Sequence, residues 1–250
     1  MILAAESFFS RVGIWNFGFR WLHILAGIAW IGLLYYFNFV QVPAFAEYGD
    51  EGRARNFAID KVARRALWWF RWAAISTFVT GIIIVGIAEG YFEGGLKIAG
   101  NSGILAGMLL GTIMMLNVWG VIWRNQKVVL ANAANLIAGG SADPGAAAAG
   151  RRALMASRQN VVFSVTMLWF MVFRGHSPYS TSELTGGKLA LFWIVFLVLV
   201  AVMELNALGL LPWKTEAKKG LNLMYDTVRN VIVAAFVFWA INMILWEIIK

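Results

Sequence analysis

The sequence contains no cysteine and only two histidines among its 250 residues. Without cysteine, the chain forms no disulfide, no thiolate metal site, no iron–sulfur cluster and no CxxCH attachment of a c-type haem. Two histidines do not build a three-histidine metal site within the chain. The HExxH, Glu-x-x-His, P-loop, dinucleotide-binding and GxSxG motifs are also absent. A tightly held cofactor is therefore expected to depend on histidine, oxygen, methionine or packing.

Charge is scarce as well. Charged residues make up only 14% of the chain and hydrophobic residues 60%, with a mean hydropathy of +0.70. A soluble domain has about 25% charged residues, so the composition indicates an integral membrane protein. The formal net charge of +8 then records topology and contact with anionic membrane lipid, and nucleic acid is not an expected partner.

The long apolar segments predict an all-α, polytopic membrane helix bundle that forms a single transmembrane domain over residues 1–250. A helix needs about 20 residues to cross the hydrocarbon core. About six segments reach that length, at residues 16–42, 66–88, 103–123, 153–174, 188–211 and 226–249.

The basic residues predict the orientation. Grouping alternate loops and span ends places 15 of the 21 Lys and Arg residues on one side. The positive-inside rule makes that side cytoplasmic, so both termini are expected outside, in the periplasm of a Gram-negative bacterium.

His23 lies in the first span, within "RWLHILAGIAWIGLLYYFNFVQVPAF". At 3.6 residues per turn, His23, Gly27, Trp30 and Leu34 share one face of the helix. A histidine with a glycine one turn below and a tryptophan below that offers an iron ligand, space for a flat ring and an aromatic wall, as a haem b pocket needs. The alternative is that His23 binds a neighbouring carbonyl or lipid headgroup, and that Gly27 lets two helices approach.

His176 lies in "MVFRGHSPYS", just past the outer end of the fourth predicted span. His23 and His176 therefore fall on the same side of the membrane, so the two can serve as haem ligands in one site. Arg20 and Arg174 lie at the same level, where a guanidinium can pair with haem propionates or an anionic substrate. Ordinary snorkelling of the two arginines to the interface is the alternative.

Few polar residues fall inside the predicted spans. Glu204 is the only carboxylate placed deep in one, where it either carries a proton or forms a satisfied hydrogen bond. Asn38, Asn117 and Asn242 are expected to form hydrogen bonds between helices.

Glycines 103, 107 and 111 form two consecutive GxxxG steps that predict close packing against another helix or room for a cofactor edge. Seven tryptophans near span ends, Trp246 among them, are expected to be interfacial anchors.

Three stretches together resemble the transmembrane domain of the bacterial membrane-bound urate oxidase (urate hydroxylase) family. They are "RWLHILAGIAWIGLLYYFNFVQ", "RRALWWFRWAAISTFVTG" and "TMLWFMVFRGHSPY". The LHxxAGxxWxG core is also similar, more distantly, to helical membrane proteins of the copper-resistance CopD type and of the haem-containing HemJ type.

The resemblance implies a redox protein of the bacterial inner (cytoplasmic) membrane. It would hold haem b and pass electrons from a small reduced substrate, urate in that family, to an acceptor. Family members carry a cytochrome c domain, whereas these 250 residues contain no cysteine, so a separate cytochrome c or a quinone is the expected acceptor. The alternative is a non-catalytic accessory subunit, with or without haem, that packs in a larger respiratory or monooxygenase complex or as a homo-oligomer.

Overall fold

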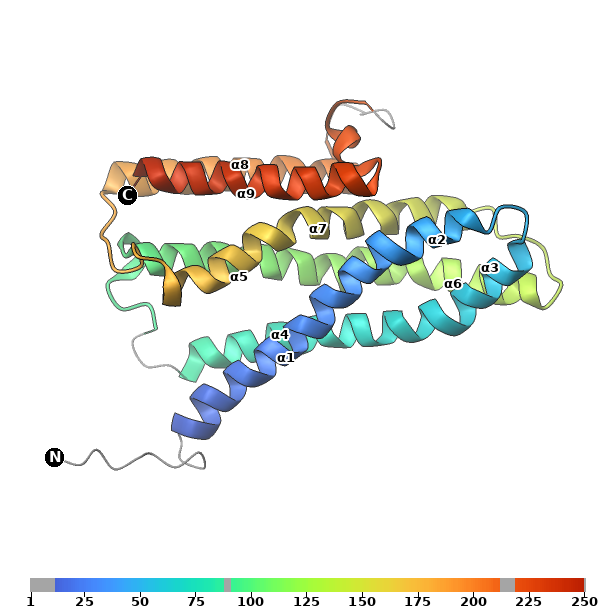
Figure 1. Ribbon diagram of the computed structural model, residues 1–250, viewed down its shortest axis with the longest axis horizontal. Helices are drawn as coiled ribbons and strands as arrows, with labels where there is room; N and C mark the ends of the chain where they lie inside the picture. The colour runs from blue at the N-terminus through green and yellow to red at the C-terminus, as the bar shows by residue number, and fades with distance from the viewer. Residues whose placement is uncertain (1–11, 88–90, 212–218, 250) are drawn as a thin grey trace.

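The computed structural model describes residues 12–87, 91–211 and 219–249, and within these ranges the chain is helical with no strand (Figure 1). π-Helical turns at Val12–Gly18, Tyr36–Gln41, Ile59–Ala63 and Asn117–Ile122 continue directly into neighbouring α-helices. The α-helices are α1 Phe19–Tyr35, α2 Val42–Glu47, α3 Gly52–Ala58, α4 Arg64–Ile87, α5 Ala99–Leu116, α6 Trp123–Ile137, α7 Ala146–His176, α8 Gly186–Leu208 and α9 Val228–Ile249.

Five of the continuous helical stretches are long and apolar enough to cross a membrane. They contain the predicted spans at 16–42, 66–88, 103–123, 188–211 and 226–249, except for a few terminal residues. The stretch Ala99–Ile137 has 39 residues, which corresponds to about 60 Å of helix, whereas the hydrocarbon core is about 30 Å thick. Helix α6 therefore continues well past any membrane that α5 crosses.

The predicted span at 153–174 lies within α7, a 31-residue helix. Helix α7 has more buried residues than any other described helix and contacts α1, α5, α6, α8 and α9. It carries buried polar side chains, so its composition is less apolar than that of the other five. Helices that surround it can satisfy such groups inside a membrane, and the crossing of α7 remains a prediction.

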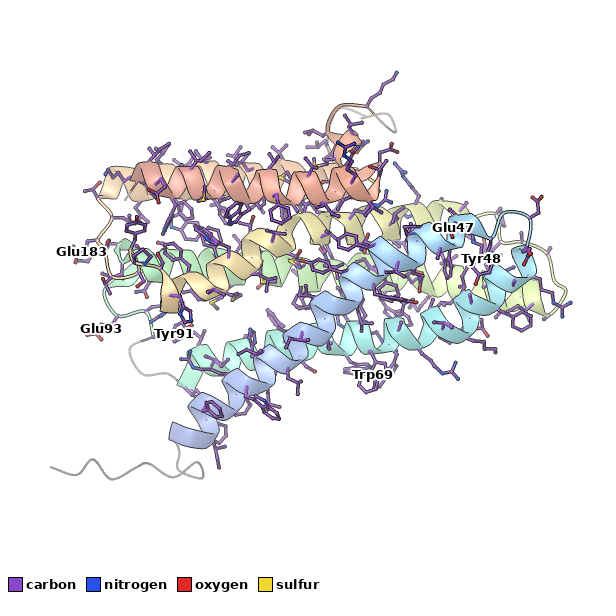
Figure 2. All side chains as sticks on the ribbon, viewed as in Figure 1. Glu47, Tyr48, Trp69, Tyr91, Glu93 and Glu183 are labelled. Atoms are coloured by element: carbon purple, nitrogen blue, oxygen red, sulfur yellow. The ribbon has the colours of Figure 1, made fainter. Side chains whose placement is uncertain are left out.

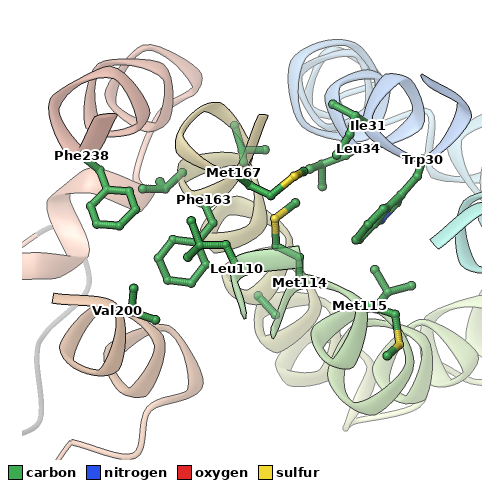
Figure 3. Packing of buried hydrophobic residues seen from close by; sticks show 14 of the residues in the cluster. Trp30, Ile31, Leu34, Leu110, Met114, Met115, Phe163, Met167, Val200 and Phe238 are labelled. Atoms are coloured by element: carbon green, nitrogen blue, oxygen red, sulfur yellow. The ribbon is translucent and has the colours of Figure 1, made fainter. Parts of the chain in front are cut away.

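The closest contacts between long helices join α1 to α4, α5 to α7, and α7 to α9, and α8 packs against both α7 and α9 (Figure 1). The α5–α7 pair lies in the middle, and Figure 3 shows the hydrophobic core on both sides of it. Phe163 of α7 meets Phe238 of α9 with ring centroids 5.5 Å apart. On the other side, Met114 and Met167 lie toward Leu34 of α1 (Figure 3).

The glycine repeat of α5 packs against α7, as the GxxxG spacing predicts. A Cβ on Gly103 would lie 2.8 Å from a ring carbon of Phe173, and one on Gly107 would lie 3.0 Å from the Cβ of Phe170. At Gly111 the nearest atoms would be 3.9 Å away. The first two glycines therefore set the close approach of α5 to α7, and the third is not needed for it.

The loops at one end of the bundle are joined to each other. The backbone N–H of Ala99 donates to the carbonyl of Ser182 at 2.9 Å, and that of Leu184 donates to the carbonyl of Lys97 at 2.7 Å. Figure 2 shows Tyr91 and Glu183 at this end and Glu47 toward the other. Helix α1 begins and α9 ends at the same end of the bundle as these joined loops (Figure 1).

Candidate functional site

The imidazole of His23 is fixed by the backbone of α4. Its Nδ1 lies 2.8 Å from the carbonyl oxygen of Thr77 and 3.2 Å from the hydroxyl of Thr80. A carbonyl oxygen only accepts hydrogen bonds, so Nδ1 carries the hydrogen and donates it. This is the carbonyl contact that the alternative to haem ligation predicts. The neutral ring also keeps its lone pair on Nε2, as a metal-binding histidine oriented by a second partner does, so haem ligation stays a prediction.

Gly81 makes room for that imidazole. A Cβ at position 81 would lie 3.1 Å from Cε1 of His23 and 3.4 Å from Nδ1. Gly81 is one helical turn after Thr77, so the hydrogen-bond acceptor and the close approach come from one face of α4. The sequence reasoning missed both residues, because nothing in the spacing of α1 tells which part of another helix faces His23.

Gly27 and Trp30 lie on the same side of α1 as His23, as the helical spacing predicts. A Cβ on Gly27 would meet the methyl group of Thr77 at an ordinary 3.9 Å. Trp30 is only 2% exposed and its ring lies toward Met114 and Met115 (Figure 3). Its indole Nε1 is buried with no hydrogen-bond partner among the described residues. The indole nitrogens of Trp193 and Trp246 are unpartnered in the same way, so this feature is not specific to the side of α1 that carries His23.

His176 faces a different helix. It is exposed at the end of α7 and lines a cavity of about 290 Å³ between that end, the following loop and α9. Within the described ranges no hydrogen bond joins the two histidines, because His23 contacts α4 and His176 opens toward α9. The cavity is lined by Trp169, Val172, Phe173, His176, Ser177, Pro178, Tyr179, Met243, Trp246 and Glu247.

The two arginines differ in their surroundings. Arg20 is exposed on α1, three residues before His23. Arg174 lies over the ring of Tyr91, with its guanidinium carbon 3.9 Å from the ring centroid, in a cation–π contact. The Nη1 atom of Arg174 is buried and has no partner among the described residues. Arg174 is therefore positioned by Tyr91, in the loop between α4 and α5.

The polar residues of the spans form a second cluster toward the opposite end. Asn117 donates to Asn160 at 3.0 Å and to Glu204 at 3.2 Å, so it joins three helical stretches as expected. Asn38 donates to Ser157 at 2.8 Å. Asn242 differs from the expectation, because its side chain donates to the carbonyl of Phe238 in its own helix.

Trp246 also departs from its expected role. It is 2% exposed. The centroid of its ring lies 4.7 Å from the ring centroid of Phe192 and 5.0 Å from that of Phe173. Its position near the end of α9 suggested an interfacial anchor, but α9 turns this face toward α7 and α8. The residue is part of the core and of the wall of the cavity at His176.

No family model, curated protein or solved structure matched this chain in comparisons with all three. The functional argument consequently depends on the geometry above and on the resemblance of the sequence motifs.

Proposed function

We propose that the chain is a membrane-embedded redox protein that binds haem b through Nε2 of His23 and oxidises a small planar substrate, urate by resemblance of its motifs. The observation that carries the proposal is the hydrogen bond from Nδ1 of His23 to the Thr77 carbonyl, because it leaves Nε2 as the metal-binding nitrogen. A haem held here would supply one-electron transfer between substrate and acceptor.

The residues around His23 have separate roles in this proposal. Thr77 fixes the tautomer and the plane of the imidazole. Gly81 allows the ring to approach α4. Gly27 has no side chain, so nothing projects from α1 one turn after His23. Arg20 lies at the level where a propionate or an anionic substrate would reach the interface.

We assign the substrate to the cavity that His176 lines. Its aromatic walls suit a flat ring, which stacks on aromatic faces at low entropic cost. Its volume of about 290 Å³ is at the lower limit for small-ligand sites, about 300 Å³. His176 would hold or accept a proton at this site, and joint ligation of one iron by His176 and His23 stays a prediction.

The proposed setting is a bacterial inner membrane, with six crossings, α7 included, and both termini on the outer side. A separate cytochrome c or a quinone takes the electrons. The basic loops at the opposite end then face the cytoplasm and anionic lipid.

Spectroscopy of the purified, full-length protein tests this function. We expect a b-type absorption spectrum that dithionite reduces and that urate also reduces in the absence of oxygen. Heat-treated protein with the same amount of haem added is the control for non-specific reduction. A b-type spectrum that urate leaves unchanged would refute urate as the substrate.

Absence of haem from protein that co-purifies with a larger membrane complex would instead support an accessory subunit. The exposed apolar face of α9, which includes Val233, Phe236 and Val237, offers such a subunit a contact surface, although a lipid-facing helix has the same composition.

A further inference from the structure

Glu204 lies four residues before the end of α8 and is the only acidic residue of that helix. Among the described residues, the ion pairs join Asp60 to Lys61 and Arg64, and Glu183 to Lys97. Glu204 is therefore without a cationic partner within that part of the chain. An ionised carboxylate in a hydrocarbon environment is costly unless a counter-charge or several hydrogen bonds compensate it.

The described contact of the Glu204 carboxyl is with a neutral amide. Nδ2 of Asn117 lies 3.2 Å from Oε2 of Glu204 and 3.0 Å from Oδ1 of Asn160, so one NH₂ group serves two acceptors. The Asn160 amide is in turn fixed by the carbonyl of Met114 at 2.9 Å. This arrangement orients one oxygen of the carboxyl and supplies no positive charge.

Asn117 begins the π-helical segment Asn117–Ile122, and Asn38 lies in the π-helical segment Tyr36–Gln41. Each of these segments sends an asparagine to the polar part of α7, at Asn160 and Ser157 respectively. π-Helical turns cost stability and occur often at functional sites. Because a π-helical segment supplies the asparagine at both contacts, this polar part of the bundle is a candidate functional site.

Tyr225 covers the cluster on the inner side. It ends the 3₁₀ segment Gly220–Tyr225, is 0% exposed, and donates its hydroxyl to Oε1 of Gln159. The same hydroxyl lies 3.3 Å from the carbonyl of Met203, the residue before Glu204. A phenol is neutral when protonated and negative when ionised, so Tyr225 gives Glu204 no positive counter-charge.

Other charged groups described at this end include Arg151 and Arg158 on α7, Lys219 before the 3₁₀ segment, Asp226 after it, and Arg229 on α9. Arg158 directs its Nη1 to the backbone carbonyls of Tyr225 and Asp226. Its described hydrogen bonds therefore fasten the loop that carries Tyr225, and none of them goes to the Glu204 carboxyl.

We propose that Glu204 is a proton-binding site. Its carboxyl is protonated in the resting protein and exchanges its proton with the inner solution when the 3₁₀ segment Gly220–Tyr225, called the Tyr225 loop below, moves away from it. The Asn117 amide holds one carboxyl oxygen and the proton resides on the other. Proton binding here needs no haem, so this proposal and the proposed redox function can fail separately.

Infrared spectroscopy of the full chain in lipid bilayers tests the site at about pH 7, where exposed carboxyls are ionised. We expect a carbonyl stretch of a protonated carboxylic acid that Glu204→Gln removes. Glu183→Gln, at the exposed ion pair with Lys97, is the matched control and keeps the band. In D₂O the band shifts slowly, because the Tyr225 loop must open for exchange.

A second variant assigns the band even where Glu204→Gln fails to fold. Asn117→Ala removes the amide donor from Oε2 while the acid remains, so the carbonyl stretch moves to higher frequency. No acid band in the wild type would mean that Glu204 is ionised and would overturn the proposal. A band that persists unchanged in both variants would overturn it as well, because another carboxyl would then be its source.

Discussion

At the scale of single residues, Gly81 helps to determine the orientation of the His23 imidazole. The carbon that any larger side chain would place there lies 3.1 Å from the imidazole, a distance at which the ring must move. Thr77 holds the same edge of the ring through a hydrogen bond from Nδ1. The orientation of His23 is therefore set by two residues of α4 that are one helical turn apart.

Gly81→Val is expected to displace the imidazole and break its hydrogen bond to Thr77. Loss of such a supporting contact typically costs 10- to 100-fold in metal affinity, so we predict a fall in haem affinity of about that size, measured by haem titration. Gly86→Val is the matched control, since it is on the same helix with nothing within 4 Å of the added Cβ. Equal affinities for the two variants would contradict the assigned role of Gly81.

The sequence predicted part of this site and missed part of it. His23, Gly27 and Trp30 share a face because helical periodicity determines it. Thr77 and Gly81 are more than 50 positions away, and only the crossing of α1 over α4 brings them to His23. The cavity at His176 was missed for the same reason, because it depends on where α9 packs against the end of α7.

At the scale of helices, the α5–α7 contact depends on two glycines that the GxxxG pattern identified. Gly107→Ala would place a methyl group 3.0 Å from the Cβ of Phe170 and 3.4 Å from backbone atoms of α7. Overpacking of this kind costs about 1–3 kcal/mol, so the unfolding free energy in detergent should fall by that amount.

The same substitution at Gly111 is the control for helix propensity, because its nearest neighbours are 3.9 Å away. Gly111→Ala should leave the unfolding free energy unchanged or raise it slightly, since alanine favours helix by up to about 1 kcal/mol. A Gly111→Ala variant that loses as much stability as Gly107→Ala would show that the close approach is not specific to the first part of the ridge.

The buried phenol of Tyr225 makes the stability of the fold depend on pH in the alkaline range. Burial raises the pKa of Tyr225 from its ordinary 10.0, so the folded state retains the phenolic proton that the unfolded state loses. The stabilisation is complete below about pH 10 and is lost as the pH rises above it. We predict that the unfolding free energy of the wild type falls above about pH 10. The unfolding free energy of the Tyr225→Phe variant should fall less steeply over the same range.

Tyr225→Phe should also cost about 1–3 kcal/mol at neutral pH, because the Oε1 atom of Gln159 is left buried without its donor. Tyr36→Phe is the control, since the Tyr36 hydroxyl has no hydrogen bond in the described structure. Identical alkaline slopes for the wild type and Tyr225→Phe would show that Tyr225 does not titrate in this window.

At the scale of the whole molecule, the arrangement of helices predicts which loops share a side. The loop after α6 and the loop after α7 lie at opposite ends of α7. A chain without cysteine allows single cysteines to report on this directly. We predict that Thr181→Cys reacts in intact cells with a membrane-impermeant maleimide and that Ser141→Cys reacts only after lysis.

Labelling of both positions from the same side would mean that α7 does not cross the membrane. Positions 141 and 181 are both exposed, so burial does not account for a difference between them. The reverse pattern, with Ser141→Cys labelled from outside, would invert the proposed orientation and place the site of His23 on the cytoplasmic side.

Five of the six predicted spans coincide with helices that are long and apolar enough to cross a membrane, because continuous hydrophobic stretches report directly on spanning helices. Helix α7 was recognised as a helix from the same signal, but its central position was not. Neighbouring elements supply hydrogen-bond partners to its buried Asn160 and to Oε1 of Gln159, and a one-dimensional pattern does not contain these partners.

The central claim is that Nε2 of His23 binds haem iron. A pyridine haemochrome assay on the purified wild type, His23→Ala and His176→Ala measures it most directly. We predict haem in the wild type and its loss from a folded His23→Ala variant, whereas loss from His176→Ala as well would show that both histidines ligate the iron. Full retention of haem by His23→Ala would contradict the claim.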